Sequence, residues 1–294
     1  MNQHTSHHNN ENWLLLLLLT FIWGSSYILI KNGLQSFTAV ELASLRISIT
    51  FFASLPFVYK AVKTIPRDKY TTVLQIGIFG SGAPAFLFAF SMTHSESAVN
   101  GILNSLSPLW TIVVGYFLFN VGISRLKIIG VLMGFAGAVV LVLGKSVGNL
   151  QVNVLYSFLP VVATFCYGMS TNITKQRMQN LHPLYSTALA MCMIGVPAFV
   201  LFLFSDAPQK IALGNVNGAL ASVATLSIAG TLLAWVLFYR LVQRTDALFA
   251  ASVTYLIPIV AVAWGLWFGE TLSAIQLGGM ALILTGVYFT TGKK

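Results

Sequence analysis

Four polar side chains recur at helical spacing inside an apolar stretch of this 294-residue chain. Asn100, Asn104, Ser107 and Thr111 fall on one face of a helix, because side chains three or four residues apart lie above one another. A polar face surrounded by apolar sequence must turn away from a lipid environment. It would either line a polar cavity or hydrogen-bond neighbouring helices, and we favour the cavity.

Aromatic side chains form a second set of candidates for ligand binding. Their rings stack on apolar parts of a ligand and offer O–H or N–H groups at the edge. The same rings would also serve simple packing or an aromatic belt at a membrane interface, so both interpretations stay open. The candidates are Trp23, Tyr27, Phe88, Tyr167, Trp235, Tyr239 and Tyr255.

Three prolines interrupt apolar segments and are candidate hinges. Pro84 shares a helix face with Ser81 and Phe88, and its ring frees a backbone carbonyl and can bend the helix. Pro108 and Pro258 lie in similar stretches of the two halves of the chain. Paired interruptions at corresponding positions are typical of transporter sites, although each proline could also make a static kink.

Arg46 is the one basic residue that lies well inside an apolar segment. A guanidinium at that depth costs roughly 2.5–3.5 kcal/mol on an insertion scale unless a partner helps. It could pair with Glu41, with a backbone carbonyl or with a substrate carboxylate, and we favour the structural ion pair. The remaining candidates give no catalytic cluster, since Cys166 and Cys192 lie in separate segments. We therefore predict no catalytic residue, no metal and no cofactor.

The composition decides which solvent these residues face. Hydrophobic residues make up 56% of the chain, and charged residues 8%, where a soluble domain has roughly 25%. This excludes a soluble enzyme and a nucleic-acid-binding protein, because so few charges cannot cover so much apolar sequence. The formal charge of +9 instead reflects Lys and Arg in short loops, as in membrane proteins. The sequence predicts an all-α integral membrane protein in a lipid bilayer.

Ten segments are long and apolar enough to be predicted transmembrane helices. They precede and follow short breaks rich in turn residues and charges. The predicted spans are 13–32, 39–59, 71–92, 97–119, 125–144, 152–174, 184–204, 217–239, 247–268 and 274–291. Residues 1–12 are predicted to form a disordered cytoplasmic tail, because they are polar and contain three of the five His residues.

The loop charges predict the orientation. Most of the sixteen Lys and Arg residues lie in the two tails and in the loops of one side, whereas Lys31, Lys145 and Lys210 belong to the other side. Positive residues stay inside, so both termini are predicted to be cytoplasmic, in a bacterial inner membrane. Gly130 and Gly134 have the spacing of a close helix-packing motif, for a dimer face or within the monomer, and we expect a monomer or a weak dimer.

The two halves of the chain resemble each other. Pro108 corresponds to Pro258, and Trp23-Gly24 corresponds to Tyr167-Gly168. We predict one five-helix repeat over residues 13–147 and a second over 148–294. Because five is an odd number of spans, the halves would run in opposite directions, as in many secondary transporters.

The chain resembles the drug/metabolite transporter superfamily, and within it the ten-span EamA-type exporters. The resemblance rests on Trp23-Gly24-Ser25-Ser26, Lys31 and Arg46, and on small residues before Pro108 and Pro258. Gly269-Glu270-Thr271-Leu272 and the glycines after it complete the pattern. The departure is Asn120, where the family usually has the glutamate that this chain keeps as Glu270.

The resemblance implies export of small polar metabolites, often amino acids, through a cavity between central helices. Our leading hypothesis is a secondary transporter that works by alternating access, and a broad-specificity drug exporter is the alternative. An intramembrane lipid enzyme would need a nucleophile with a base or a metal cluster, which the spans lack. Since every acid near a span falls at its end, we predict that transport does not depend on a midplane carboxylate.

Overall fold

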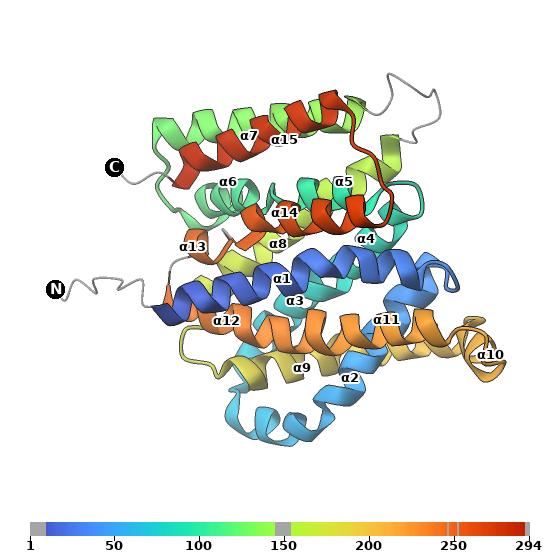
Figure 1. Cartoon of the computed structure of the whole chain (residues 1–294). Coiled ribbons are helices and arrows are strands. Elements are labelled where there is room, and N and C mark those ends of the chain that lie inside the picture. Colours follow the sequence, from blue (N-terminus) through green and yellow to red (C-terminus); the bar gives the residue numbers. More distant parts are fainter. Residues whose placement is uncertain (1–9, 145–153, 246, 252, 292–294) are drawn as a thin grey trace.

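The computed structural model describes residues 10–144, 154–245, 247–251 and 253–291, and over these residues the chain is helical without any β-strand (Figure 1). The α-helices are α1 Asn10–Gly33, α2 Ala39–Thr64, α3 Tyr70–Gly77, α4 Ala83–Met92, α5 Ser97–Asn104, α6 Ser107–Phe119, α7 Arg125–Gly144, α8 Val154–Arg177, α9 Pro183–Leu203, α10 Ala207–Ala212, α11 Asn217–Ser227, α12 Ala234–Arg244, α13 Ala247–Ala251, α14 Val253–Trp267 and α15 Ala274–Thr291. Three short segments join them: the 3₁₀ turn η1 Arg67–Lys69 and the π-helices η2 Ile78–Gly82 and η3 Ile228–Leu233.

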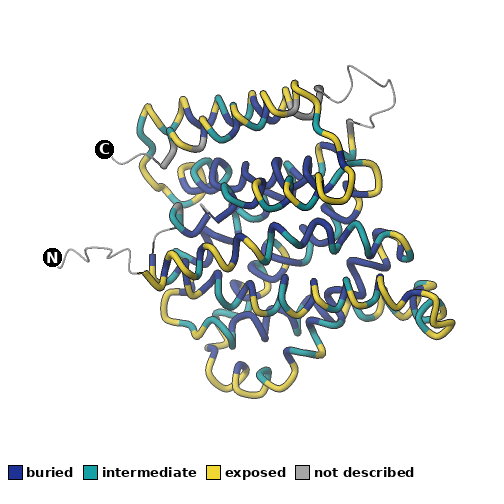
Figure 2. The backbone as a smooth tube through the Cα atoms, viewed as in Figure 1, coloured by how far each residue is buried: buried dark blue, intermediate teal, exposed yellow. Residues whose placement is uncertain are grey.

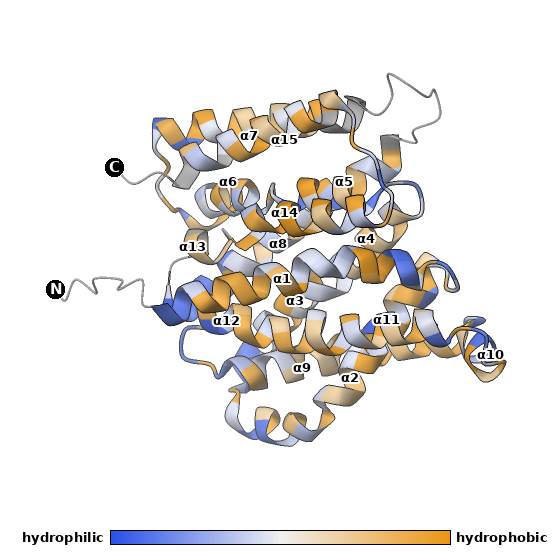
Figure 3. Cartoon of the chain, in the orientation of Figure 1, coloured by the Kyte–Doolittle hydropathy of each residue, from blue (hydrophilic) through white to orange (hydrophobic). Residues whose placement is uncertain are grey.

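The helices have the length and composition of membrane spans. Seven runs of the described chain are long and apolar enough to cross a bilayer. Their outward faces carry large apolar side chains, such as Phe117 and Trp267, which would be unfavourable in water. Hydrophobic residues recur along all of the long helices (Figure 3). The chain is therefore a multi-pass membrane protein, as the composition predicted.

The predicted segment bounds agree with the observed helices to within a few residues at most ends. The first helix begins at Asn10, inside the predicted tail of residues 1–12, whose first nine residues lie outside the described part. The predicted boundary between the halves, at residues 147 and 148, also lies outside it.

The helices pack as a layered bundle with two paired edges. Helix α7 packs along α15 at one edge, and α2 packs along α9 at the other (Figure 1). Between the edges, α1 packs on α14 and α6 packs on α8. Buried residues concentrate in these central helices, whereas the edges and the ends of the bundle are exposed (Figure 2).

Glycines allow the closest of these contacts. A Cβ atom added to Gly286 of α15 would lie 2.5 Å from the carbonyl oxygen of Gly130 and 2.6 Å from the backbone nitrogen of Gly134. The backbones of α7 and α15 therefore touch, as in other small-residue motifs. Of the two roles considered for Gly130 and Gly134, the structure places them in packing within the chain.

Two π-helices and one turn interrupt the central helices at the level of the cavity described below. Helix α3 continues through η2 into α4, with Pro84 near the start of α4, and α11 continues through η3 into α12. The turn at Ser105 and Leu106 separates α5 from α6, in which Pro108 is near the start. Pro258 lies inside α14. π-Helices are often associated with functional sites, since they redirect side chains and free backbone carbonyls.

Candidate functional site

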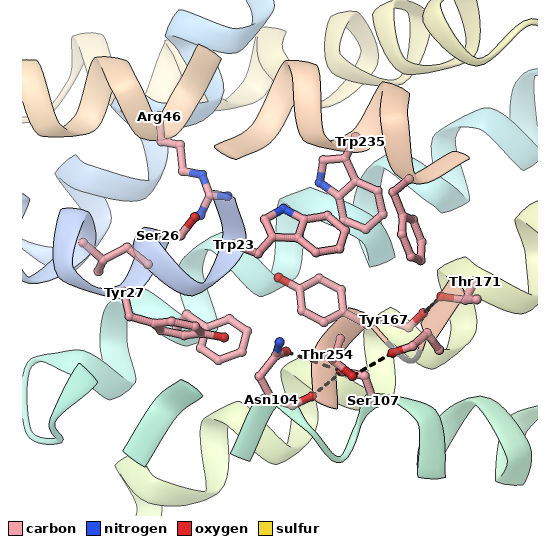
Figure 4. A pocket seen from close by; sticks show the side chains of 14 residues that line it. Trp23, Ser26, Tyr27, Arg46, Asn104, Ser107, Tyr167, Thr171, Trp235 and Thr254 are labelled. Carbon is pink, nitrogen blue, oxygen red and sulfur yellow. Dashed lines mark hydrogen bonds between the residues drawn. The ribbon is translucent and has the colours of Figure 1, made fainter. Parts of the chain in front are cut away.

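An internal cavity lies at the centre of the bundle, where side chains of the central helices converge (Figure 4). It offers about 50 Å³ to the centre of a water molecule, which is room for several waters. The lining residues come from α1, α2, α4, α5, α6, α8, α12, α13 and α14. They are Trp23, Ser26, Tyr27, Ile30, Arg46, Phe88, Asn104, Ser107, Tyr167, Thr171, Trp235, Phe238, Ala251 and Thr254.

Aromatic rings form one wall of the cavity. The ring of Trp23 lies 5.5 Å from that of Trp235 and 5.2 Å from that of Phe238, and Tyr167 lies 6.0 Å from Trp235. The indole N–H of Trp23 donates to the carbonyl oxygen of Gly230 in η3 at 3.0 Å. The π-helix therefore fixes the orientation of this ring, which leaves its face to the cavity.

Arg46 lies in the cavity wall without a carboxylate partner among the described residues. Its guanidinium is buried, and Nε donates to Oγ1 of Thr231 in η3 at 2.8 Å. The Glu41 carboxylate lies elsewhere: it accepts from Nζ of Lys210 at 2.7 Å and from the backbone N–H of Thr38 at 2.7 Å. The favoured structural pair between Arg46 and Glu41 is therefore wrong, because Glu41 caps the start of α2 and pairs across to Lys210.

The hydroxyl groups of the cavity wall already donate within their own helices. Ser107 donates to the carbonyl of Asn104 at 2.7 Å, Thr171 to that of Tyr167 at 2.8 Å, and Thr254 to that of Ala251 at 2.8 Å (Figure 4). In apolar helices, serine and threonine hydroxyls commonly donate to a backbone carbonyl three or four residues earlier. Their oxygens remain available to accept a hydrogen bond from a ligand.

Eight of the twelve predicted ligand-binding residues line the cavity and four lie outside its wall. Ser81 is buried in η2, and Tyr239 packs behind Trp235 with ring centres 5.2 Å apart. Asn100 donates to Ser95 at 2.6 Å and to the carbonyl of Glu96 at 2.9 Å, so it serves the turn before α5. Tyr255 packs against the separate apolar cluster that residues of α5, α6, α7 and α15 form.

Some of the residues that line the cavity without having been predicted follow from helical spacing. Thr171 lies one turn after Tyr167, and Phe238 lies nearly one turn after Trp235, so each extends a predicted face. Thr254 and Ser26 could have been found in the same way from neighbouring cavity residues. Ile30 and Ala251 carry no polar or aromatic signal that would separate them from packing residues.

A buried carboxylate closes the end of the bundle where α1 ends. Glu270 accepts from Nζ of Lys31 at 2.6 Å and from the backbone N–H groups of Ser97 and Ala98, at 3.2 and 3.0 Å. Burial alone raises the pKa of Glu270, but these hydrogen bonds outweigh it and the pKa is lowered from its ordinary value. We call this arrangement the Glu270 latch.

A different latch closes the end where α1 begins. Nζ of Lys175 donates to the carbonyl oxygens of Val242 and Thr245 at the end of α12. Lys31 and Lys175 correspond in the two halves, and Lys31 meets the carboxylate of Glu270. No group of three or more His, Cys, Asp and Glu residues that could hold a metal ion occurs in the described residues.

A polar and aromatic cavity in the middle of a helical membrane protein is the arrangement of a transporter. The comparison with protein families agrees, because the EamA-like transporter family matches residues 12–143 and again residues 155–292. The chain belongs to this family, and the resemblance seen in the sequence is confirmed.

Individual relatives are distant but cover nearly the whole chain. An uncharacterized transporter of Archaeoglobus fulgidus is 24% identical, over 97% of this chain and 100% of that protein. A probable amino-acid metabolite efflux pump of Salmonella typhimurium is 24% identical over 95% of this chain and 94% of its own length. An uncharacterized inner membrane transporter of Escherichia coli is 25% identical over 94% and 89%.

A solved crystal structure shares the fold. It superimposes with a TM-score of 0.67 at 16% identity, over 96% of each chain. The family and the relatives' names are those of transporters rather than enzymes.

Proposed function

We propose that this protein is a secondary transporter that exports small metabolites, such as amino acids, by alternating access. The observation that carries the proposal is Arg46: a buried cation in the cavity wall with no carboxylate beside it in the described structure. A buried charge without a counter-charge is unfavourable and suggests that a ligand completes the pair. The name of the Salmonella typhimurium relative supports an amino-acid metabolite as cargo.

The proposed architecture is ten transmembrane helices in two inverted five-helix repeats. The two matches to the family support a duplication, with one match to each half. Equivalent contacts support it too: a Cβ atom on Gly24 would meet Val260, and one on Gly168 would meet Trp110. These are the same pair of positions in the two halves, by the correspondence of Pro108 with Pro258. The π-helices η2 and η3 also occupy matching positions.

We propose an orientation with both termini in the cytoplasm of a bacterial cell and the protein in the inner membrane. The distribution of Lys and Arg supports it. The two ends of the described chain, in α1 and α15, lie at one end of the bundle (Figure 1). The Glu270 latch then closes the outer end and the Lys175 latch closes the inner end. Alternating access requires that the two open in turn.

A broad-specificity drug exporter is the second candidate. The aromatic wall formed by Trp23, Trp235 and Phe238 favours it, because such surfaces stack on many flat apolar molecules. Arg46 disfavours the cationic members of that class, since two like charges would share one buried site. The same cavity thus serves both candidates, and the charge of the cargo separates them.

Counterflow into liposomes tests the proposal. Purified protein is reconstituted with an unlabelled amino-acid or organic-acid panel inside, and uptake of the labelled compound is followed. We expect saturable counterflow of at least one small metabolite, lost in Arg46→Gln and kept in Arg240→Gln, whose side chain is exposed. Flux of toxic organic cations alone would overturn the proposal in favour of the drug exporter.

A further inference from the structure

The cavity carries one formal positive charge and no negative one among its described lining residues. Arg46 is its cation, and the other side chains are neutral aromatic, amide, hydroxyl or aliphatic groups. Glu41 and Glu270 are occupied by lysines at the outer end. A ligand with a net charge of −1 would therefore make the closed cavity neutral, whereas a zwitterion would leave it at +1.

Several hydrogen-bond donors around Arg46 have no acceptor among the described residues. Only Nε of its guanidinium has an acceptor in the described structure, which leaves both terminal amino groups for a ligand. The phenol groups of Tyr27 and Tyr167 line the same cavity, as does Asn104 (Figure 4). Among the described residues, neither phenol group nor the side-chain N–H₂ of Asn104 has a hydrogen-bond partner. Two parallel N–H groups of a guanidinium fit the two oxygens of a carboxylate.

The aromatic side of the cavity determines whether the rest of the ligand is apolar or charged. The rings of Trp23, Trp235 and Phe238 offer flat apolar surface to the body of a ligand. An ammonium group placed there would find only neutral acceptors, such as the hydroxyls of Ser107 and Thr254. Such acceptors compensate a buried charge poorly.

We infer that the preferred cargo is a small amphiphilic monoanion: a carboxylate on a flat apolar body without a free ammonium group. An organic acid or an amino acid with an acylated amine meets this description. The inference rests on the proposed transport function and narrows its substrate class, because the relatives' names alone leave amino acids and their derivatives equally open.

Three compounds with one phenyl side chain test the charge directly. N-acetyl-L-phenylalanine carries a charge of −1, L-phenylalanine is a zwitterion and phenethylamine is a cation. Each compound is added outside proteoliposomes, at matched internal and external pH, as a competitor of the counterflow of the labelled metabolite. We expect half-maximal competition by the monoanion at a concentration at least tenfold lower than by the zwitterion, and none by the cation. A tenfold ratio corresponds to about 1.4 kcal/mol.

Variants at Arg46 separate charge recognition from folding. Arg46→Lys keeps the cation and is expected to keep the order of the three compounds, whereas Arg46→Gln is expected to lose the preference for the monoanion. Arg240→Gln is the matched control, because that side chain is exposed away from the described cavities. The unfolding temperature in detergent shows whether each variant is folded. If Arg46→Gln does not fold, the order of the three compounds in Arg46→Lys provides the test.

The outcomes for inference and function differ. Equal or stronger competition by the zwitterion, with saturable flux, would overturn the inference and leave the proposed transport function standing. Strong competition by phenethylamine would overturn the inference and favour the drug exporter. Absence of flux and of competition for all compounds of the wider panel would overturn both.

Discussion

Lys31 and Glu270 meet at 2.6 Å across 239 residues of sequence, and the same carboxylate holds the first two N–H groups of α5. One side chain therefore ties α1, the start of α5 and the turn before α15 together at the end of the bundle where α1 ends. A charge-assisted bond shared by three segments holds them more tightly than an exposed surface pair would.

Breaking the Glu270 latch should open the outer end. In Glu270→Gln the shape is kept but the charge that holds Lys31 is lost. We expect a reporter Ile30→Cys, in a Cys166→Ala, Cys192→Ala background, to react several-fold faster with an impermeant thiol reagent. Ile30 lines the cavity beside Lys31, so its labelling reports access from outside.

The control for this experiment is Glu11→Gln, which breaks the exposed pair with Arg244 at 2.7 Å, at the start of α1 and the opposite end of the bundle. It should leave the labelling rate unchanged. Equal labelling in Glu270→Gln and in the protein with Glu270 intact would contradict the assignment of this contact as a gate.

The latch should also weaken in acid, and the direction follows from the lowered pKa of Glu270. The folded protein binds fewer protons at this site than the unfolded chain, so the contribution to stability is present above the ordinary pKa of 4.5. It is lost as pH falls through the lowered value of the folded state. The unfolding temperatures of the wild-type protein and of Glu270→Gln in detergent should therefore converge below about pH 4.5. A constant difference down to pH 3 would exclude the linkage.

Thr231 is expected to position Arg46 rather than to touch the cargo. Thr231→Val removes the acceptor of Nε, so the guanidinium loses its fixed orientation. A hydrogen bond to a charged group contributes about 1.5–3 kcal/mol, which predicts a rise of about tenfold or more in KM with a smaller change in maximal flux. Thr231→Ser should restore KM. A fall in maximal flux alone, with KM unchanged, would argue for a role in helix packing.

Gradient-driven accumulation should survive Glu41→Gln. Glu41 is buried at the start of α2 and pairs with Lys210, outside the cavity. The described cavity wall contains no carboxylate that could carry a proton across the membrane. Accumulation of labelled substrate against its gradient in proteoliposomes measures this. Complete loss of accumulation, with counterflow intact, would show that this carboxylate couples transport.

The contact between α6 and α8 should tolerate no side chain at Gly168. An added Cβ atom would lie 2.8 Å from the carbonyl carbon of Trp110 and 3.0 Å from the backbone nitrogen of Thr111. Backbone atoms cannot move aside easily, so Gly168→Ala should destabilise the protein by about 1–3 kcal/mol. Gly218→Ala in α11 meets nothing within 4 Å and should be neutral or slightly stabilising. Thermal unfolding in detergent compares the two.

Helical spacing predicted much of the cavity but not how far along a helix face the cavity extends. Asn100 and Asn104 lie one turn apart in the same helix α5, yet only Asn104 lines the cavity. The amide of Asn100 instead donates to the loop before α5. Ser107 lines the cavity although a turn separates it from α5. Neither the proline pattern nor hydropathy marks where along the helix the cavity ends.

The sequence also did not predict which charged residues form ion pairs. Glu41 is close to Arg46 in sequence, yet it pairs with Lys210, because the start of α2 lies near α10. Contacts between residues so far apart depend on how the helices pack. The segment bounds were more predictable, since lipid imposes a minimum apolar length on each span. The π-helices had no distinct signal in the sequence, because their residues fit an α-helix equally well.

The order in which the chain is made gives the Glu270 latch a further meaning. Lys31 enters the membrane with the first helix, but its carboxylate belongs to the turn before the last one. During synthesis, Lys31 and the first N–H groups of α5 would therefore lack the Glu270 carboxylate until the turn before α15 has been made. A chain shortened before Glu270 would leave both unsatisfied. The unpaired lysine and the uncapped start of α5 would loosen this end of the bundle and expose it to proteases.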